Sequence, residues 1–135
     1  MPGTGFPRVA DTDPCPCGSG DAFGGCCGPL LRGEPAPSAE RLMRSRYTAF
    51  VVGDERHLAG SWHPGTRPRT LDLDPRVWWT GLEILAAEAG RSGDRRGTVE
   101  FRATWRDGRE TGILHERSRF VFQRDRWWYL DGDLD

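Results

Sequence analysis

The sequence lacks lysine, long apolar segments and an excess of positive charge. All 19 of its basic side chains other than histidine are arginine, a bias that GC-rich coding explains because lysine codons cannot be GC-rich. The formal net charge is −1, whereas general binding of nucleic acid draws on an excess of positive charge. No segment approaches the ~20 apolar residues of a membrane-spanning helix, and residues 1–10 contain no apolar run typical of a secretory signal. We therefore expect a cytoplasmic protein that neither spans a membrane nor binds nucleic acid.

Cysteine is absent outside one short segment. The chain has four cysteines, and they are Cys15, Cys17, Cys26 and Cys27. Two close pairs joined by a glycine-containing loop can bring four sulfur atoms to one point, and a closed structural Zn²⁺ site takes four such ligands. Disulfides are one alternative, but adjacent cysteines bridge only through a strained ring, and crossed pairing needs an oxidising compartment. Free or redox-active thiols are another. The spacing favours one structural Zn²⁺ ion.

The cysteine segment also resembles a known motif. Residues 15–27 read Cys-Pro-Cys-Gly-Ser-Gly-x-x-Phe-x-x-Cys-Cys, which is similar to the SEC-C motif, the small zinc module at the end of the SecA translocation ATPase. Together with the segments that follow, the chain resembles the bacterial YchJ family from residue 15 to residue 132. The segments that carry this likeness are residues 28–33, 39–50, 62–64, 79–84 and 115–120. The resemblance implies a zinc knuckle followed by a domain with the nuclear transport factor 2-like fold.

The chain divides into four parts by composition. Residues 1–14 are rich in proline, glycine and aspartate, and we expect them to be flexible. Residues 15–33 form the knuckle, which is too small for its own hydrophobic core and depends on metal for stability. Residues 34–37 form a short, stiff connector. Residues 38–135 form the main domain, which is expected to fold without the knuckle.

The main domain shows the pattern of an α+β fold. Ser38 is a suitable N-cap, apolar residues then recur at steps of three and four, and Gly53 is a suitable stop, so the pattern predicts a helix. The second half alternates with a period of two and contains a hairpin signal at Asp107-Gly108. The predicted strands are residues 77–85, 99–105, 111–123 and 127–130. A helix followed by an antiparallel meander predicts a curved sheet wrapped round the helix, in the shape of a cone with an open mouth.

Candidate residues for a pocket in this cone come from its aromatic and titratable side chains. They are Tyr47, Trp62, His63, His115 and Glu116. On a strand, His115 and Glu116 point to opposite faces, so we expect them not to share one pocket. We expect a mainly apolar and aromatic cavity with at most one histidine, and a solvent-exposed His57. For His63 and His115, a structural role in a buried hydrogen bond is the alternative to a role in the pocket.

The sequence therefore predicts a non-enzymatic zinc protein with two binding regions. The knuckle is expected to contact a protein partner, and the cone to hold a small ligand or to form a homodimer. One alternative is a small-molecule enzyme that uses His63, His115 or Glu116 in acid–base roles, although the chain contains no nucleophile elbow, dinucleotide motif or phosphate-binding loop. The other alternative is a redox sensor whose zinc thiolates are oxidised and release the metal.

Overall fold

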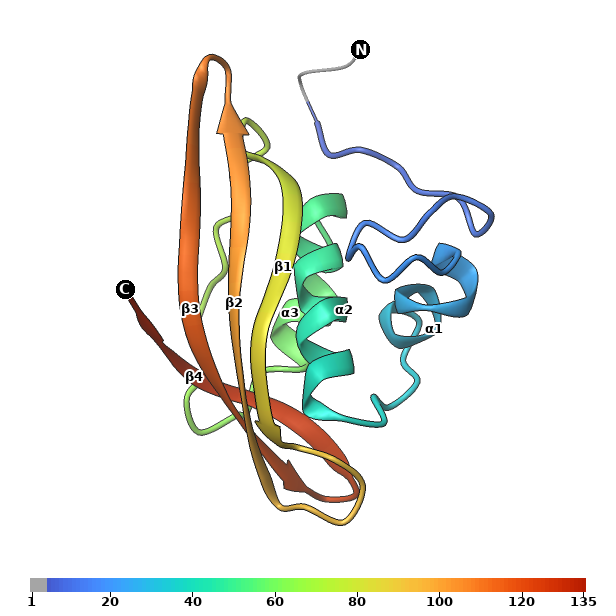
Figure 1. Ribbon diagram of the computed structural model, residues 1–135, viewed down its shortest axis with the longest axis vertical. Coiled ribbons are helices and arrows are strands. Elements are labelled where there is room, and N and C mark those ends of the chain that lie inside the picture. The colour runs from blue at the N-terminus through green and yellow to red at the C-terminus, as the bar shows by residue number, and fades with distance from the viewer. Residues whose placement is uncertain (1–4) are drawn as a thin grey trace.

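Three layers make up the protein in the computed structural model, which describes residues 5–135. Helix α2 lies between a curved sheet and an N-terminal segment that contains α1 (Figure 1). The helical elements are η1 (Phe23–Gly25), α1 (Cys27–Leu31), α2 (Ala39–Val52) and α3 (Glu55–Gly60). The strands are β1 (Trp78–Ala89), β2 (Arg96–Asp107), β3 (Glu110–Gln123) and β4 (Arg126–Leu134). They form one antiparallel sheet in the order β1-β2-β3-β4, which confirms the predicted α+β architecture.

Local capping chemistry sets the ends of α2. The Ser38 side chain accepts a hydrogen bond of 3.1 Å from the backbone N–H of Arg41, and Gly53 ends the helix with a left-handed φ of 75°. Both ends agree with the helix that the sequence predicts. A second, short helix follows at once, because the Asp54 carboxylate accepts from the His57 N–H at 2.9 Å and caps α3.

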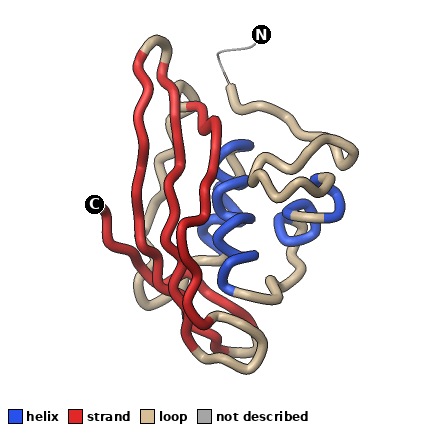
Figure 2. The backbone as a smooth tube through the Cα atoms, viewed as in Figure 1, coloured by secondary structure: helices blue, strands red, loops and turns tan. Residues whose placement is uncertain are grey.

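Every strand is longer than the sequence indicates, and β2 spans Arg96–Asp107 where residues 99–105 are predicted. β1 continues to Ala89 and β4 continues to Leu134, beyond the predicted ends at residues 85 and 130. Both extensions gain ladder partners, since Ala89 pairs with Gly97 and Leu134 pairs with Glu116. Irregular pairing interrupts the β1 register twice and the β3–β4 register once. Such bulges bend and twist a sheet, and the sheet curves around α2 (Figure 2).

The N-terminal segment packs on α2 and shares its core. The four cysteines belong to one buried cluster that also contains Leu42 of α2 and Phe120 of β3. Residues 11–13 run along the knuckle, where the backbone carbonyls of Asp11 and Asp13 accept from Gly24 and Phe23. Residues 5–14, expected from composition to be flexible, therefore make specific contacts, while residues 1–4 of that predicted segment lie outside the described residues. Among the helices of residues 5–135, none combines the length and apolar character needed to cross a membrane.

Candidate functional site

A tight hairpin positions the first pair of cysteines. The Cys15 N–H donates to the Asp21 carbonyl at 2.9 Å, and Pro14 forms an isolated bridge with Ala22. At the tip, the Gly18 N–H donates to the Cys15 carbonyl at 3.1 Å, and Gly18 has a φ of 80° that few other residues adopt. The chain therefore reverses immediately after Cys17. The second pair of cysteines follows at the junction of η1 and α1.

The four thiols have the geometry of a tetrahedral metal site. The Sγ atoms of Cys15, Cys17, Cys26 and Cys27 all lie within 4.8 Å of one another. The Sγ atoms of Cys17 and Cys26 are 3.7 Å apart, whereas a tetrahedron with Zn–S bonds of about 2.3 Å has edges of about 3.8 Å. The four residues are between 0% and 5% exposed. The donor set and its burial thus fit a closed metal site, as the sequence predicts for these cysteines.

The thiols of the cluster shift one another's pKa values in opposite directions. Hydrogen bonds from the thiols of Cys15 and Cys27 lower the pKa of Cys17. The same kind of hydrogen bond, to Cys15 and Cys17, raises the pKa of Cys27, and burial raises the pKa of Cys26. One thiolate is therefore stabilised at the expense of its neighbours. A divalent cation would compensate all four charges together, and this is why metal binding releases protons from such sites.

Side chains from α2 and the hairpin surround the sulfur atoms. The Ser19 hydroxyl lies 3.2 Å from Sγ of Cys26, and the Thr48 hydroxyl lies 3.9 Å from Sγ of Cys15. From α2, Arg44 Nη1 donates to the Cys17 carbonyl at 2.9 Å and Arg41 Nη2 donates to the Cys26 carbonyl at 3.3 Å. Four thiolates around one Zn²⁺ ion carry a charge of about −2. The two arginines place positive charge beside it and attach the knuckle to the helix.

A cavity of about 190 Å³ lies on the opposite side of α2, against the inner face of the sheet. The helix contributes residues at steps of three and four, and Trp62 and Tyr129 contribute from the loop after α3 and from β4. The lining residues are Met43, Arg46, Tyr47, Phe50, Trp62, Trp79, Phe101, Ala103, Leu114, Glu116, Ser118, Phe120 and Tyr129. Most of these side chains are apolar or aromatic, and no histidine belongs to the lining that residues 5–135 form. The expectation of an apolar cavity with at most one histidine is confirmed.

One cation and one carboxylate face this cavity. Arg46 is 6% exposed, and its Nη1 donates to the Leu58 carbonyl at 2.8 Å and to the Ser61 hydroxyl at 2.7 Å. Burial lowers the pKa of Arg46 to about 10, so its guanidinium stays charged at neutral pH. The Glu116 carboxylate accepts from the Ser118 hydroxyl at 2.6 Å and from the Tyr129 hydroxyl at 3.1 Å.

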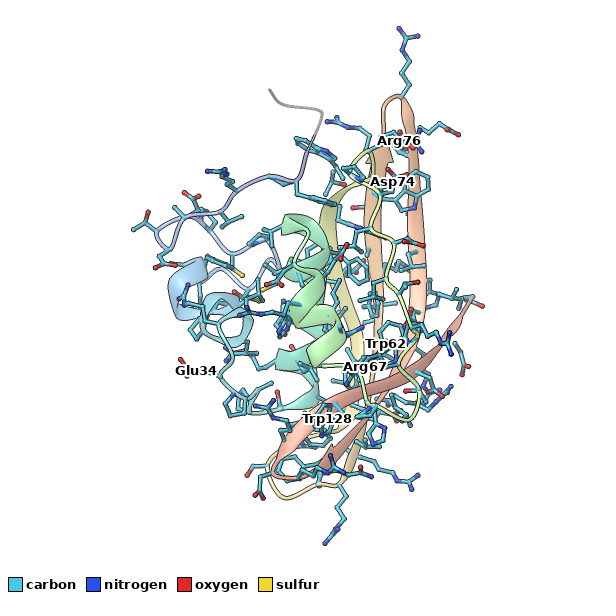
Figure 3. All side chains as sticks on the ribbon, turned by 180° about the vertical axis from the view of Figure 1, so that it is seen from behind. Glu34, Trp62, Arg67, Asp74, Arg76 and Trp128 are labelled. Atoms are coloured by element: carbon cyan, nitrogen blue, oxygen red, sulfur yellow. The ribbon has the colours of Figure 1, made fainter. Side chains whose placement is uncertain are left out.

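The five candidate pocket residues separate into two groups. Tyr47, Trp62 and Glu116 line the cavity, whereas His63 and His115 do not. His63 follows Trp62 into the loop, where its Nδ1 accepts from the Gly65 N–H and its Nε2 lies 2.8 Å from Gln123 Oε1. Trp62 and Arg67 lie close together at the start of this loop (Figure 3), because Arg67 donates to the Trp62 carbonyl.

His115 lies on the outer face of the sheet. Its Nε2 is 2.6 Å from Glu100 Oε2 and its Nδ1 is 2.9 Å from Asp135 Oδ2. Strand alternation thus keeps His115 out of the cavity that Glu116 lines. The expectation that the two share no pocket was nevertheless wrong, because both line a separate surface depression beside the C-terminal residues. The expectation of an exposed His57 was wrong. Its Nε2 lies 2.9 Å from the Ser45 hydroxyl, and burial, with the nearby charge of Arg46, lowers its pKa to about 4.

Sequence reasoning missed Arg46 and Tyr129 as parts of the cavity. The Cζ atom of Arg46 lies 4.2 Å from the ring centroid of Tyr129 and 5.1 Å from that of Trp62, within the range of cation–π contacts. The helical period offered a partial signal, because Arg46 and Phe50 are four residues apart on α2. Tyr129 had no such signal, since its role depends on an isolated parallel bridge between Tyr129 and Trp62.

Comparison with known proteins agrees with this architecture. The family model described as the YchJ middle NTF2-like domain matches residues 38–132, and the SEC-C motif matches residues 12–29. A UPF0225 protein of Streptomyces coelicolor is 52% identical over 124 residues, which cover 91% of this chain and 97% of the relative. A UPF0225 protein of Chromobacterium violaceum is 46% identical over 123 residues, which cover 87% of this chain and 90% of the relative.

Two solved structures share the fold. The solution structure of a SEC-C motif containing protein from Rhodopseudomonas palustris has a TM-score of 0.77 at 38% identity, and the match covers 88% of this chain and 96% of that one. The crystal structure of a SEC-C motif containing protein from Psychrobacter arcticus has a TM-score of 0.75 at 26% identity, with coverage of 93% and 84%. The chain therefore belongs to the YchJ family, with an N-terminal SEC-C motif followed by an NTF2-like domain.

Proposed function

We propose that this protein is a non-enzymatic binding protein with a structural zinc site and a small-ligand cavity on opposite faces of α2. The observation that carries the proposal is the cavity of about 190 Å³ with its apolar and aromatic walls and few polar groups. Pockets of this composition bind a ligand by burial and orient it through a small number of polar anchors. The exposed turn at residues 18–22 is the surface through which the knuckle would contact a protein partner.

A structural role for zinc is supported by the closed character of the cysteine site. Catalytic zinc sites keep one position open for water or substrate, whereas structural sites use four protein ligands. Here four thiols converge and none is more than 5% exposed. Cys15, Cys17, Cys26 and Cys27 would hold the ion, which would cross-link the hairpin to α1. The same burial opposes the redox-sensor alternative, because oxidation of cysteine follows exposure.

Binding, as opposed to catalysis, is supported by the state of the groups in the cavity. Burial is the main cause that raises the pKa of Tyr129, and the nearby charge of Glu116 raises it further. Burial also raises the pKa of Tyr47 to about 12. Both phenols therefore remain protonated, and that of Tyr129 donates to Glu116. His63 and His115 do not line the cavity, and Glu116 is the one carboxylate among the lining residues described. A general acid–base pair of perturbed groups, which active sites tend to contain, does not assemble.

Metal analysis of freshly purified, reduced protein tests the zinc part of the proposal. We expect about one zinc per chain, because four buried thiolates form a complete ligand set. Cys26→Ser should remove most of the metal, whereas Ser19→Ala, which changes a neighbour of the same sulfur atom, should retain it. A zinc content far below one equivalent in the unmodified protein would refute a structural zinc site.

A cavity-filling variant tests the ligand part. Ala103 is 2% exposed and lines the cavity, so Ala103→Leu should reduce its volume. We expect toluene to shift the NMR signals of cavity residues in the zinc-loaded full chain and to lose this effect in Ala103→Leu. Ala87→Leu places the same side chain on an exposed position of β1 and serves as the control. Equal toluene binding by both variants would place the binding site elsewhere.

A further inference from the structure

The cavity carries hydrogen-bonding groups that the protein itself leaves unused. In the described part of the chain, the side-chain hydrogen bonds of Arg46 all come from Nη1, although a guanidinium has five N–H donors. Arg46 nevertheless lines the cavity while 6% exposed. Its remaining donors, on Nε and Nη2, are therefore available to a group within the cavity. This side chain is a built-in anchor for a hydrogen-bond acceptor.

A second unused donor comes from Trp62. Its indole Nε1 is buried and has no hydrogen-bond partner within residues 5–135, and Trp62 also lines the cavity. A buried polar group without a partner destabilises the folded state, and such groups are rare in native proteins. An acceptor brought by a ligand would remove this destabilisation. Trp62 lies next to Arg46, with 5.1 Å between the guanidinium carbon and the ring centroid, so the two side chains lie at the same end of the cavity.

Glu116 provides the complementary acceptor. Its Oε2 receives the hydrogen bonds from Ser118 and Tyr129, and among the described residues Oε1 receives none. Arg46 and Glu116 line the same cavity but form no ion pair with each other in residues 5–135. The two charges are therefore held apart inside one space. A polar group that accepts from Arg46 and donates to Glu116 fits between them.

The charges of Arg46 and Glu116 cancel, and this determines the charge of the ligand. A carboxylate would be attracted by Arg46 but repelled by Glu116. A cation would be attracted by Glu116 but repelled by Arg46. An ionised ligand would also lose its hydration among aromatic walls, which is costly unless its charge is fully paired. A neutral ligand avoids both penalties. The electrostatic balance of the cavity therefore favours a neutral molecule.

The cavity volume limits the ligand to about one ring. A protein cavity of ~150 Å³ lined by apolar side chains binds benzene, whereas pockets for drug-sized molecules span ~300–1,000 Å³. The volume of about 190 Å³ accepts a single ring with a small polar substituent. Tyr47, Phe50 and Trp79 supply aromatic surfaces for such a ring.

From these observations we propose that the cavity binds a small neutral cyclic molecule whose polar end both accepts and donates hydrogen bonds, as a primary amide does. Arg46 and Trp62 donate to the acceptor atom, and Glu116 accepts from the donor atom. This inference rests on the proposed function, because it requires the cavity to be a ligand site. It adds the charge and the hydrogen-bonding character of the ligand.

Three probes of nearly equal shape test the inference. Benzamide is neutral, benzoate is an anion and benzamidinium is a cation, and each is titrated into the zinc-loaded full chain with NMR detection. We expect benzamide to bind at the cavity about ten-fold more tightly than either ion, a difference of about 1.4 kcal/mol. In Glu116→Gln the positive charge of Arg46 is no longer balanced, so the preference should move to benzoate. Glu83→Gln, an exposed position that pairs with Arg102, should keep the preference for benzamide.

The outcomes separate this inference from the proposed function. If neither toluene nor any of the three probes binds at the cavity, the proposed function fails and the inference fails with it. If toluene binds but benzoate or benzamidinium binds as tightly as benzamide, the cavity is a ligand site and the inference on charge is wrong. The comparison of probes in the unmodified protein decides this even if Glu116→Gln does not fold.

Discussion

Arg44 of α2 donates a hydrogen bond from Nη1 to the backbone carbonyl of Cys17 at 2.9 Å. This contact joins the helix that lines the cavity to the hairpin that holds the metal ligands. Its neighbour Arg41 makes a similar bond to the Cys26 carbonyl, and Thr48 lies beside Cys15. These three α2 residues are three and four positions apart, so they form one helical face. The opposite face of the same helix supplies the cavity with Met43, Arg46, Tyr47 and Phe50.

Removal of the Arg44 side chain should loosen the knuckle. A hydrogen bond from a charged donor contributes about 1.5–3 kcal/mol, and the Arg44 side chain is only 19% exposed. We expect Arg44→Ala to lower the free energy of unfolding by about that amount and to speed the transfer of zinc to a chelator. Arg32→Ala is the control, because Arg32 pairs with Asp11 at an exposed site where ion pairs contribute little. Equal effects of the two changes on zinc transfer would contradict a role for Arg44 in docking.

Deletion of residues 1–33 should weaken the main domain. Composition suggests that residues 38–135 fold alone, but Leu30 and Leu42 line the same groove between α1 and α2, and Thr48 is fully buried beside Cys15. Leu30 leaves with the deleted segment, and exposure of the Leu42 side chain that it covers costs about 1.5–3 kcal/mol, a large fraction of the stability of a small domain. We therefore expect the truncated chain to lose its near-ultraviolet circular dichroism and its cooperative unfolding. A truncated chain with the stability of the full protein would show that the knuckle is an independent module.

The elements that the sequence predicts well are those fixed by local chemistry. The ends of α2 depend on the Ser38 cap and on Gly53, and both act within a few residues. The strand alternation that keeps His115 out of the cavity lined by Glu116 is likewise local. The cysteine spacing predicts a convergent cluster for the same reason, since a short hairpin brings the two pairs together.

The cavity depends instead on contacts between distant segments. The helical period places Arg46 on the same face of α2 as Met43 and Phe50, but an arginine ordinarily extends into solvent. Its burial requires the Leu58 carbonyl from α3 and the Tyr129 ring from β4. Trp62 is held by its bridge to Tyr129, and that bridge joins residues far apart in the sequence. No local pattern encodes these contacts, so the charged pair in the cavity could not be predicted.

The end of α2 offers a stability test at Gly53. Its φ of 75° is unfavourable for alanine, and a methyl group there would also contact the ring of Phe6. We expect Gly53→Ala to lower the free energy of unfolding by about 1–2 kcal/mol in urea denaturation. Gly60→Ala is the matched control, because nothing lies within 4 Å of the added methyl group and Gly60 has no positive φ. It should be neutral or stabilising by up to about 1 kcal/mol, and a similar loss in both variants would contradict the conformational argument.

His57 should make stability depend on pH between about 4 and 6.5. Its pKa falls from 6.5 to about 4 in the folded protein, so the unfolded chain binds a proton in this range and the folded chain does not. The stabilising contribution is complete above pH 6.5 and decreases as the pH falls, by up to roughly 3 kcal/mol at pH 4. His57→Gln keeps a hydrogen-bond donor for Ser45 but cannot titrate. We expect the difference in unfolding free energy between the unmodified protein and His57→Gln to shrink by that amount from pH 7 to pH 4 in urea titrations. Parallel pH profiles for the two proteins would show that His57 is protonated equally in the folded and unfolded states.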